Sequence, residues 1–277
     1  MLKSILLALH DTEAAAEASA MALDLAERHM AEITGMSVID VPFLTGREAI
    51  PIGGSHFKFE KDASLLQQAL DRSQKLRSSF AEECRRRSLA FQAEEYDGDP
   101  YSQLLGAVTL HDLVVIGRDT TFHSGPAVAL AKPVSELLRR NPRPLIVTCA
   151  EPQAGDRVVI GYDGSVPSMR SLHVFVLLGL CSGWKPLVVS IGQSKADSQA
   201  LAAVAVEFLA RHGVAAEAQG IASEADPSDI LLAECQSLHA RLLVMGAFGN
   251  SGWRESIVGS SAKRLIKAAQ VHLFVHH

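Results

Sequence analysis

The sequence predicts two tandem α/β domains, each with a five-stranded parallel β-sheet and helices on both faces. Its 277 residues suit two domains of about 150 residues each. Short apolar runs rich in β-branched residues alternate with longer segments of helical period, a pattern typical of βαβ units. The same succession of segments also occurs twice along the chain, which indicates an internal repeat.

The repeat is recognised from pairs of matching segments. These segments occur in the same order in each half. The pairs are 5–12 with 158–165, 99–105 with 226–232, and 144–148 with 272–276. A short turn-like stretch at 150–156 separates the two copies. We therefore expect one domain over residues 1–150 and a second over residues 155–277.

In the second copy, apolar runs place the strands and helical periods place the helices. The expected strands lie near 157–162, 187–191, 215–220, 241–246 and 271–275. The expected helices lie near 168–180, 197–212, 227–238 and 260–269. Gly213 suits a helix C-cap, and Asp226 followed by Pro227 suits an N-cap with proline in the first turn.

The first copy holds an insertion. The offset between matching segments falls from 153 to 127 residues, so about 26 extra residues lie between the first and second pairs. Prolines and glycines interrupt residues 40–62, which predicts a long irregular loop there. Such a loop is often functional, but a plain surface loop followed by a longer helix over 63–87 explains the pattern equally well.

Composition narrows the class of protein. A net charge of −5 gives no reason to expect a nucleic-acid or acidic-membrane partner. An aromatic content of 5% argues against a surface on which the bases of single-stranded nucleic acid stack. The apolar runs are too short to span a bilayer or to form a signal-peptide core. Four scattered cysteines suit a reducing compartment. We therefore expect a cytoplasmic protein.

A glycine-rich loop in the second copy lies between a buried strand and the last expected helix. Gly246, Gly249 and Gly259 are followed by Ser260 and Ser261. Glycines let backbone N–H groups approach an anion, and a helix N-terminus favours negative charge. The spacing predicts a phosphate-binding loop, with ordinary turn chemistry as the alternative. It matches neither the Walker loop nor the dinucleotide motif.

Three features of the second copy together resemble the universal stress protein family. They are the loop spacing G-x2-G-x9-G-S from Gly246 to Ser260, the strand end 162–165, and the Asp226-Pro227 helix followed by the run 242–246. The resemblance covers residues 156–277 and extends more loosely over 1–149, as in tandem members. It implies a Rossmann-like fold of the adenine nucleotide α-hydrolase type, with ATP bound across the carboxyl ends of the strands.

The resemblance also implies roles for individual residues. Asp163 would accept a hydrogen bond from adenine, Ile191 would pack against the base, and Gly246 would lie against the ribose. The phosphates would be wrapped by Gly249, Gly259, Ser260 and Ser261, with a divalent metal such as Mg²⁺ as a candidate companion. A turn role for Asp163 and a core role for Ile191 are the alternatives.

The first copy lacks this chemistry. His10 stands at the counterpart of Asp163, Thr120 replaces a loop glycine, and residues 131–133 read Ala-Lys-Pro in place of Gly-Ser-Ser. A proline removes a backbone donor, although Arg118 and the lysine still offer positive charge. We expect this domain not to bind ATP in the usual way. It would pair with the second domain in place of a homodimer partner, and further dimerisation of the chain stays open.

The sequence contains no recognisable Ser-His-Asp, Cys-His or paired-carboxylate motif, and scattered histidines such as His10, His111, His123 and His239 are interpreted as structural. The prediction is therefore a regulatory or stress-response protein that binds an adenine nucleotide, not an enzyme. Two alternatives stay open. One is a weak ATPase. The other is a nucleotide-free scaffold that binds a protein or a small ligand, with the segment 40–62 as a candidate surface.

Overall fold

The structure is a computed structural model that describes residues 1–46, 55–123, 128–246 and 270–276. The elements of the first half are β1 Ser4–Ala8, α1 Glu13–His29, β2 Glu32–Ile39, α2 Val41–Leu44, α3 Ser55–Arg86, β3 Phe91–Asp97, α4 Pro100–Ala107, β4 Leu113–Gly117, α5 Lys132–Arg140 and β5 Leu145–Thr148. Those of the second half are β6 Arg157–Gly161, α6 Val166–Leu177, β7 Lys185–Gly192, α7 Lys195–Arg211, β8 Glu217–Ala222, α8 Pro227–Ser237, β9 Leu242–Gly246 and β10 His272–His276.

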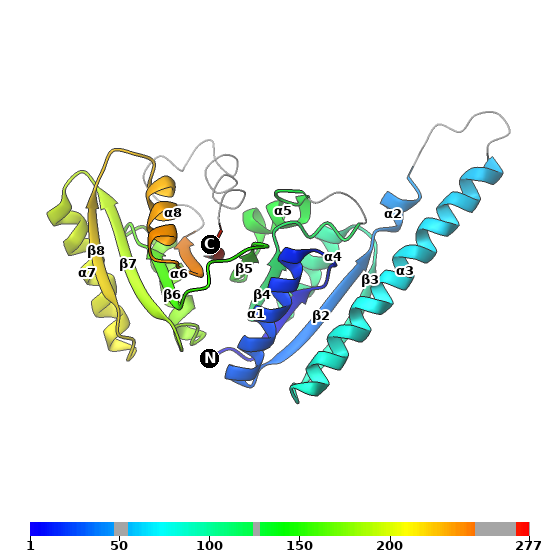
Figure 1. Cartoon of the computed structure of the whole chain (residues 1–277), viewed down its shortest axis with the longest axis horizontal. Coiled ribbons are helices and arrows are strands. Elements are labelled where there is room, and N and C mark those ends of the chain that lie inside the picture. Colours follow the sequence, from blue (N-terminus) through cyan, green and yellow to red (C-terminus); the bar gives the residue numbers. More distant parts are fainter. Residues whose placement is uncertain (47–54, 124–127, 247–269, 277) are drawn as a thin grey trace.

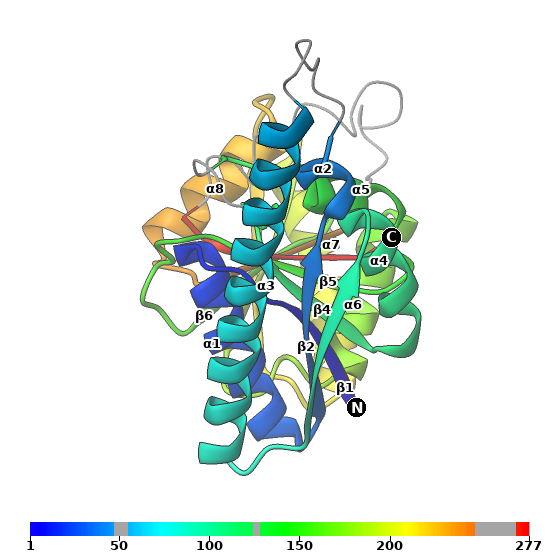
Figure 2. The same ribbon diagram turned by 90° about the vertical axis from the view of Figure 1, so that its right-hand side faces the viewer.

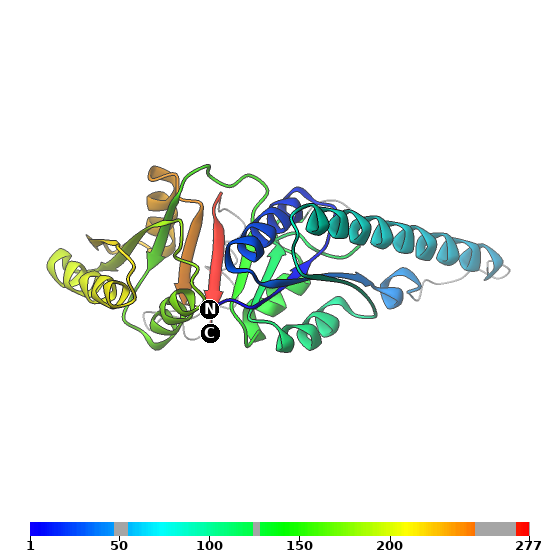
Figure 3. The ribbon, with the colours of Figure 1, turned by 90° about the horizontal axis from the view of Figure 1, so that it is seen from below.

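All ten of these strands form one sheet, in the order β3-β2-β1-β4-β5-β10-β9-β6-β7-β8 (Figure 1). Each half contributes five parallel strands in the same relative order, which confirms the predicted fold class. The two halves meet where β5 pairs with β10 in antiparallel fashion, with Phe274 opposite Ile146. Figure 3 shows β10, in red, between the halves.

Helices cover both faces of the sheet and bury alternate strand residues. Ile5 and Leu7 of β1 belong to a core under α1, α3, α6 and α7, whereas Leu6 and Ala8 belong to a core under α4, α5 and α8. This alternation follows from the period of two in a β-strand. Because both faces of the central strands are covered, their sequences are continuous apolar runs.

The predicted helix ends of the second half agree with the structure. The Asp226 side chain accepts a hydrogen bond from Ser228 N–H, and Pro227 is the first residue of α8. Gly213 follows the end of α7 with φ of +74° and donates its N–H to Ala210 O over 2.9 Å. The left-handed conformation that ends this helix is the one glycine adopts without cost.

The prediction of an irregular segment over 40–62 is partly wrong, because helix occupies both of its ends. Asp40 caps α2 by accepting Phe43 N–H at 3.0 Å, and Pro42 lies in the first turn, where proline is tolerated. The long helix α3 begins at Ser55 instead of residue 63, and Lys58 pairs with Asp62 across one turn at 2.7 Å. Residues 47–54 lie outside the described residues. Figure 2 shows α3 crossing the whole height of the sheet beside β2.

A fully buried histidine lies at the junction of the halves. Cys149 N–H donates to Nδ1 of His272 over 3.3 Å, so the neutral ring carries its proton on Nε2. That nitrogen lies 3.7 Å from Glu17 Oε2, which also lies 3.5 Å from Arg241 Nη2. Burial, with a smaller contribution from the Arg241 charge, lowers the pKa of His272 from 6.5 to about 3. The junction is therefore built around a neutral imidazole.

Candidate functional site

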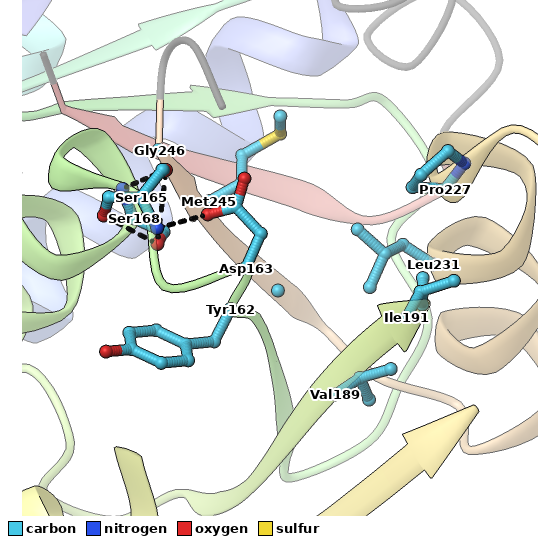
Figure 4. Close-up of a pocket in the computed structure, with 11 residues that line it drawn as sticks. Tyr162, Asp163, Ser165, Ser168, Val189, Ile191, Pro227, Leu231, Met245 and Gly246 are labelled. Atoms are coloured by element: carbon cyan, nitrogen blue, oxygen red, sulfur yellow. Dashed lines mark hydrogen bonds between the residues drawn. The ribbon is translucent and has the colours of Figure 1, made fainter. Parts of the chain in front are cut away.

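A pocket opens at the carboxyl ends of three neighbouring strands of the second half (Figure 4). In open α/β sheets, ligands bind at this end of the strands. Its walls come from β6, β7 and β9 and from the first turns of α6 and α8. The lining residues are Gly161, Tyr162, Asp163, Ser165, Ser168, Val189, Ile191, Pro227, Leu231, Met245 and Gly246.

One wall of the pocket is apolar. Val189 and Ile191 are two residues apart on β7, so their side chains point to the same face of the sheet. Leu231 of α8 lies beside Ile191, and the three side chains stand together on one side of Figure 4. Ile191 is half-buried and packs against the core, so it serves both the core and the pocket wall. Such a wall suits the face of a planar or aliphatic group.

The opposite wall is polar and is built from the start of α6. Ser165 caps this helix, and its hydroxyl lies 3.4 Å from Ser168 N–H. Asp163 Oδ1 accepts the N–H of Ser165 over 3.0 Å, and its side chain is exposed at the pocket (Figure 4). The turn role expected as an alternative for Asp163 is therefore present.

Gly246 ends β9 where the backbone of α6 comes very close. A Cβ at this position would lie 2.5 Å from Pro167 C and 2.5 Å from Ser168 N. Its counterpart in the first half, Gly117, shows the same crowding, with a Cβ only 2.7 Å from Ala15 N. Packing of a helix start against a strand end therefore requires glycine in both halves. The glycine alone says nothing about a ligand.

The structure brings together three of the predicted site residues, Asp163, Ile191 and Gly246, around one pocket. The roles predicted for them in binding stay predictions. The other predicted site residues lie outside the described residues; they are Gly249, Gly259, Ser260 and Ser261. The described chain leaves the pocket at Gly246, the residue directly before the glycine-rich loop.

Comparison with known proteins identifies this region. Residues 183–277 match the model of the universal stress protein family. Residues 183–277 are thus similar to a universal stress protein domain. A universal stress protein of Synechocystis sp. is 24% identical over 162 residues, which are 58% of this chain and 56% of that protein. The match thus spans little more than half of the curated relative.

Solved structures support the fold of the whole chain. A universal stress protein from Archaeoglobus fulgidus superposes with a TM-score of 0.68 at 17% identity, covering 99% of this chain and 95% of its own. A Pseudomonas aeruginosa structure gives a TM-score of 0.58 at 18% identity, covering 99% and 93%. These full-length matches extend the fold of the universal stress protein domain to both halves of the chain.

The first half has a different arrangement at the same edge of the sheet. His10 lies at the counterpart of Asp163, and its Nε2 lies 3.3 Å from the carbonyl oxygen of His123. His123 Nε2 in turn lies 3.4 Å from Asp40 Oδ2. Spacing along the sequence gave no sign of this cluster. Since His10 and Asp40 each follow a parallel strand, the rule that strand ends meet at one edge was the available signal.

Several other expectations concern ligands or location. Among the described residues, no group of three or more histidine, cysteine or carboxylate side chains could hold a metal ion. The four cysteines are free and buried, and burial raises the pKa of the Cys235 thiol to about 12. Within the described part of the chain, no helix has both the length and the apolar character needed to cross a membrane.

Proposed function

We propose that the second half binds an adenine nucleotide, ATP, and that the protein acts through this binding as a regulatory or stress-response protein. The observation that carries the proposal is the pocket with one apolar and one polar wall, which opens directly before the glycine-rich loop. The match of residues 183–277 to the universal stress protein family supports it.

The walls suit the parts of a nucleotide. The base would lie against Ile191 and Leu231, with its exocyclic amine donating to the Asp163 carboxylate. The phosphates would extend toward the start of α6, whose helix dipole favours negative charge, and toward the glycine-rich loop. Gly246 would face the ribose. Mg²⁺ would accompany the phosphates, as a hard cation does in many nucleotide sites.

We propose a structural role for the first half. Residues 1–150 and 155–277 would be the two units, since β5 ends at Thr148 and β6 begins at Arg157. Intramolecular pairing through β5 and β10 would replace a second chain, and a dimer of the whole protein would be an additional level of assembly. We propose that the protein binds its nucleotide in the cytoplasm and does not catalyse a reaction on it.

Calorimetric titration of the full chain with ATP tests the proposal. We expect 1:1 binding to the wild type and at least about tenfold weaker binding to Asp163→Asn, the size of one lost hydrogen bond to a charged group. Asp197→Asn makes the same change of charge at an exposed position in the first turn of α7 and serves as the control. A folded wild type that takes up no ATP would refute the proposal.

One observation favours a scaffold function as a second candidate. Phe57 and Phe59 near the start of α3 are each 74% exposed, and Phe43 of α2 is 61% exposed. Contiguous exposed apolar surface often marks a protein-binding site, and these three side chains are candidates for such a surface. Replacing the two α3 phenylalanines with serine should abolish capture of such a partner while leaving ATP titration unchanged.

A further inference from the structure

The loop after β4 folds back over the carboxyl edge of the first half. Its residue Phe122 is only 4% exposed and belongs to the same buried apolar cluster as Met36, Val38 and Leu104. The phenyl ring also meets the imidazole of His10 edge-on, with ring centroids 6.4 Å apart. A side chain from a loop therefore takes part in the core at the end of the strands.

Residues of the cluster that contains this ring correspond to the walls of the second-half pocket. The strand pairs β1·β2 and β6·β7 share one register, with Ser4 opposite Glu32 and Arg157 opposite Lys185. The wall residues therefore correspond in pairs. These pairs are Met36 with Val189, Val38 with Ile191, Leu104 with Leu231, and His10 with Asp163. In the second half these residues line a pocket. In the first half, Met36, Val38 and Leu104 share a buried apolar cluster with Phe122, and His10 meets its ring edge-on.

Hydrogen bonds, a histidine–carboxylate contact and a ring stack from three segments of the first half hold the loop in place. Arg72 of α3 donates from Nη2 to the Phe122 carbonyl oxygen over 2.9 Å, and His10 Nε2 donates to the next carbonyl, that of His123. The His123 ring lies 3.4 Å from Asp40 and stacks on Phe43 with centroids 3.8 Å apart. We call these contacts the latch. Two of its members, Phe43 and Arg72, lie on the helices α2 and α3, whose ends reach into the insertion.

The backbone of the loop is strained at the buried ring. Phe122 has φ of +65°, a left-handed conformation that is rare for a bulky side chain. The neighbouring Thr120 is fully buried, and its hydroxyl has no hydrogen-bond partner among the described residues. Both features oppose this loop conformation. The latch and the burial of the ring must therefore outweigh them.

We propose that the first half contains a pocket for a planar aromatic ring, that Phe122 occupies this pocket from within the chain, and that the latch keeps it closed. The apolar walls and the edge-on imidazole select a flat ring, and the phenyl group shows that such a ring fits. An external aromatic ligand would bind only when the loop swings outward. The first half is thus a closed counterpart of the pocket in the second half, independent of what that pocket binds.

Each pocket contains a methionine, which allows a test on the intact protein. Met36 reports on the first half and Met245 on the second, so methyl-¹³C methionine labelling and NMR separate the two pockets. The probe is indole, a neutral planar ring. We expect the Met36 signal of the wild type not to respond. Phe122→Ala should respond, because removal of a buried ring opens a cavity that binds small aromatic molecules. Phe122→Leu refills the apolar space and is the matched control.

A variant that weakens the latch but keeps Phe122 distinguishes the proposal from the simple creation of a cavity in a core. Arg72→Gln keeps the phenyl ring but removes a charged hydrogen-bond donor to the Phe122 carbonyl, so the Met36 signal of this variant should respond at indole concentrations at which the wild-type signal does not change. A Phe122→Ala protein whose Met36 signal ignores indole would overturn the proposal. If that variant does not fold, Arg72→Gln decides alone, and an Arg72→Gln titration identical to that of the wild type would overturn it.

Discussion

Acidification should weaken the junction between the two halves through one residue, His272. The folded protein keeps this ring neutral in full burial, with its pKa lowered from 6.5 to about 3. The unfolded chain binds a proton near pH 6.5 and the folded chain does not. The free energy of unfolding is therefore not reduced by His272 above pH 6.5, and it falls as the pH declines from 6.5 toward 3.

The size of the effect follows from the two pKa values. Between pH 6.5 and pH 5 the unfolded state gains a proton that the folded state refuses, and each pH unit is worth about 1.4 kcal/mol. Lowering the pH from 7 to 5 should therefore cost about 2 kcal/mol through His272 alone. Arg241, whose charge also lowers the pKa of His272, lies 3.5 Å from Glu17 Oε2 through its Nη2 atom.

The assay is urea unfolding of the wild type and His272→Asn at pH 7 and pH 5, followed by tryptophan fluorescence. The asparagine amide oxygen can accept the Cys149 N–H in place of Nδ1, and it does not titrate. The carboxylates contribute equally to both proteins and cancel in the comparison. We expect the wild type to lose about 2 kcal/mol more than the variant. Equal losses in the two proteins would show that protonation of His272 does not destabilise the junction.

Two further predictions concern the strand ends. Gly246→Ala and Gly117→Ala should each destabilise the ligand-free protein by about 1–3 kcal/mol, because the new methyl group overlaps the backbone of a helix start; urea unfolding measures this, and a neutral result would contradict the packing argument. Burial lowers the pKa of His10 and that of His123, and the positive charge of Arg72 also lowers both. The carboxylates of Asp11, beside His10, and of Asp40, beside His123, raise these pKa values by smaller amounts. Hydrogen exchange of residues 118–123 should therefore be faster at pH 5.5 than at pH 7.5, after correction for intrinsic rates, and an unchanged protection factor would exclude this coupling.

The elements of the second half were predictable because their signals are local. Asp226 and Pro227 start a helix through hydrogen bonds within one turn, and Gly213 ends one through its own backbone freedom. The start of α3 was not predictable in this way. The glycines and prolines near it drew attention to an irregular loop, whereas the helix begins directly after the last of them, at Ser55.

The candidate site shows a different limit of sequence reasoning. Asp163 and Ile191 were placed at strand ends, and parallel topology then brings them to one pocket. Gly246 was interpreted through a ligand, but the structure explains it through the helix start packed against it. The contact between His10 and His123 spans 113 residues and depends on a loop that turns back over the sheet. No local pattern encodes such a contact.

The repeat therefore gives two versions of one pocket whose differences are concentrated at the rim. The apolar walls correspond residue by residue, so both halves keep a slot for a flat group. At the rim, the second half has Asp163 and leads into a glycine-rich loop, whereas the first has His10 and a loop that carries Phe122. A carboxylate suits an external ligand with a polar edge. An imidazole that donates to the chain's own carbonyl suits closure of the pocket by the chain itself. Under the two proposals, the same walls therefore serve binding in one half and closure in the other, and the latch residues Arg72 and Asp40 decide which state the first half adopts.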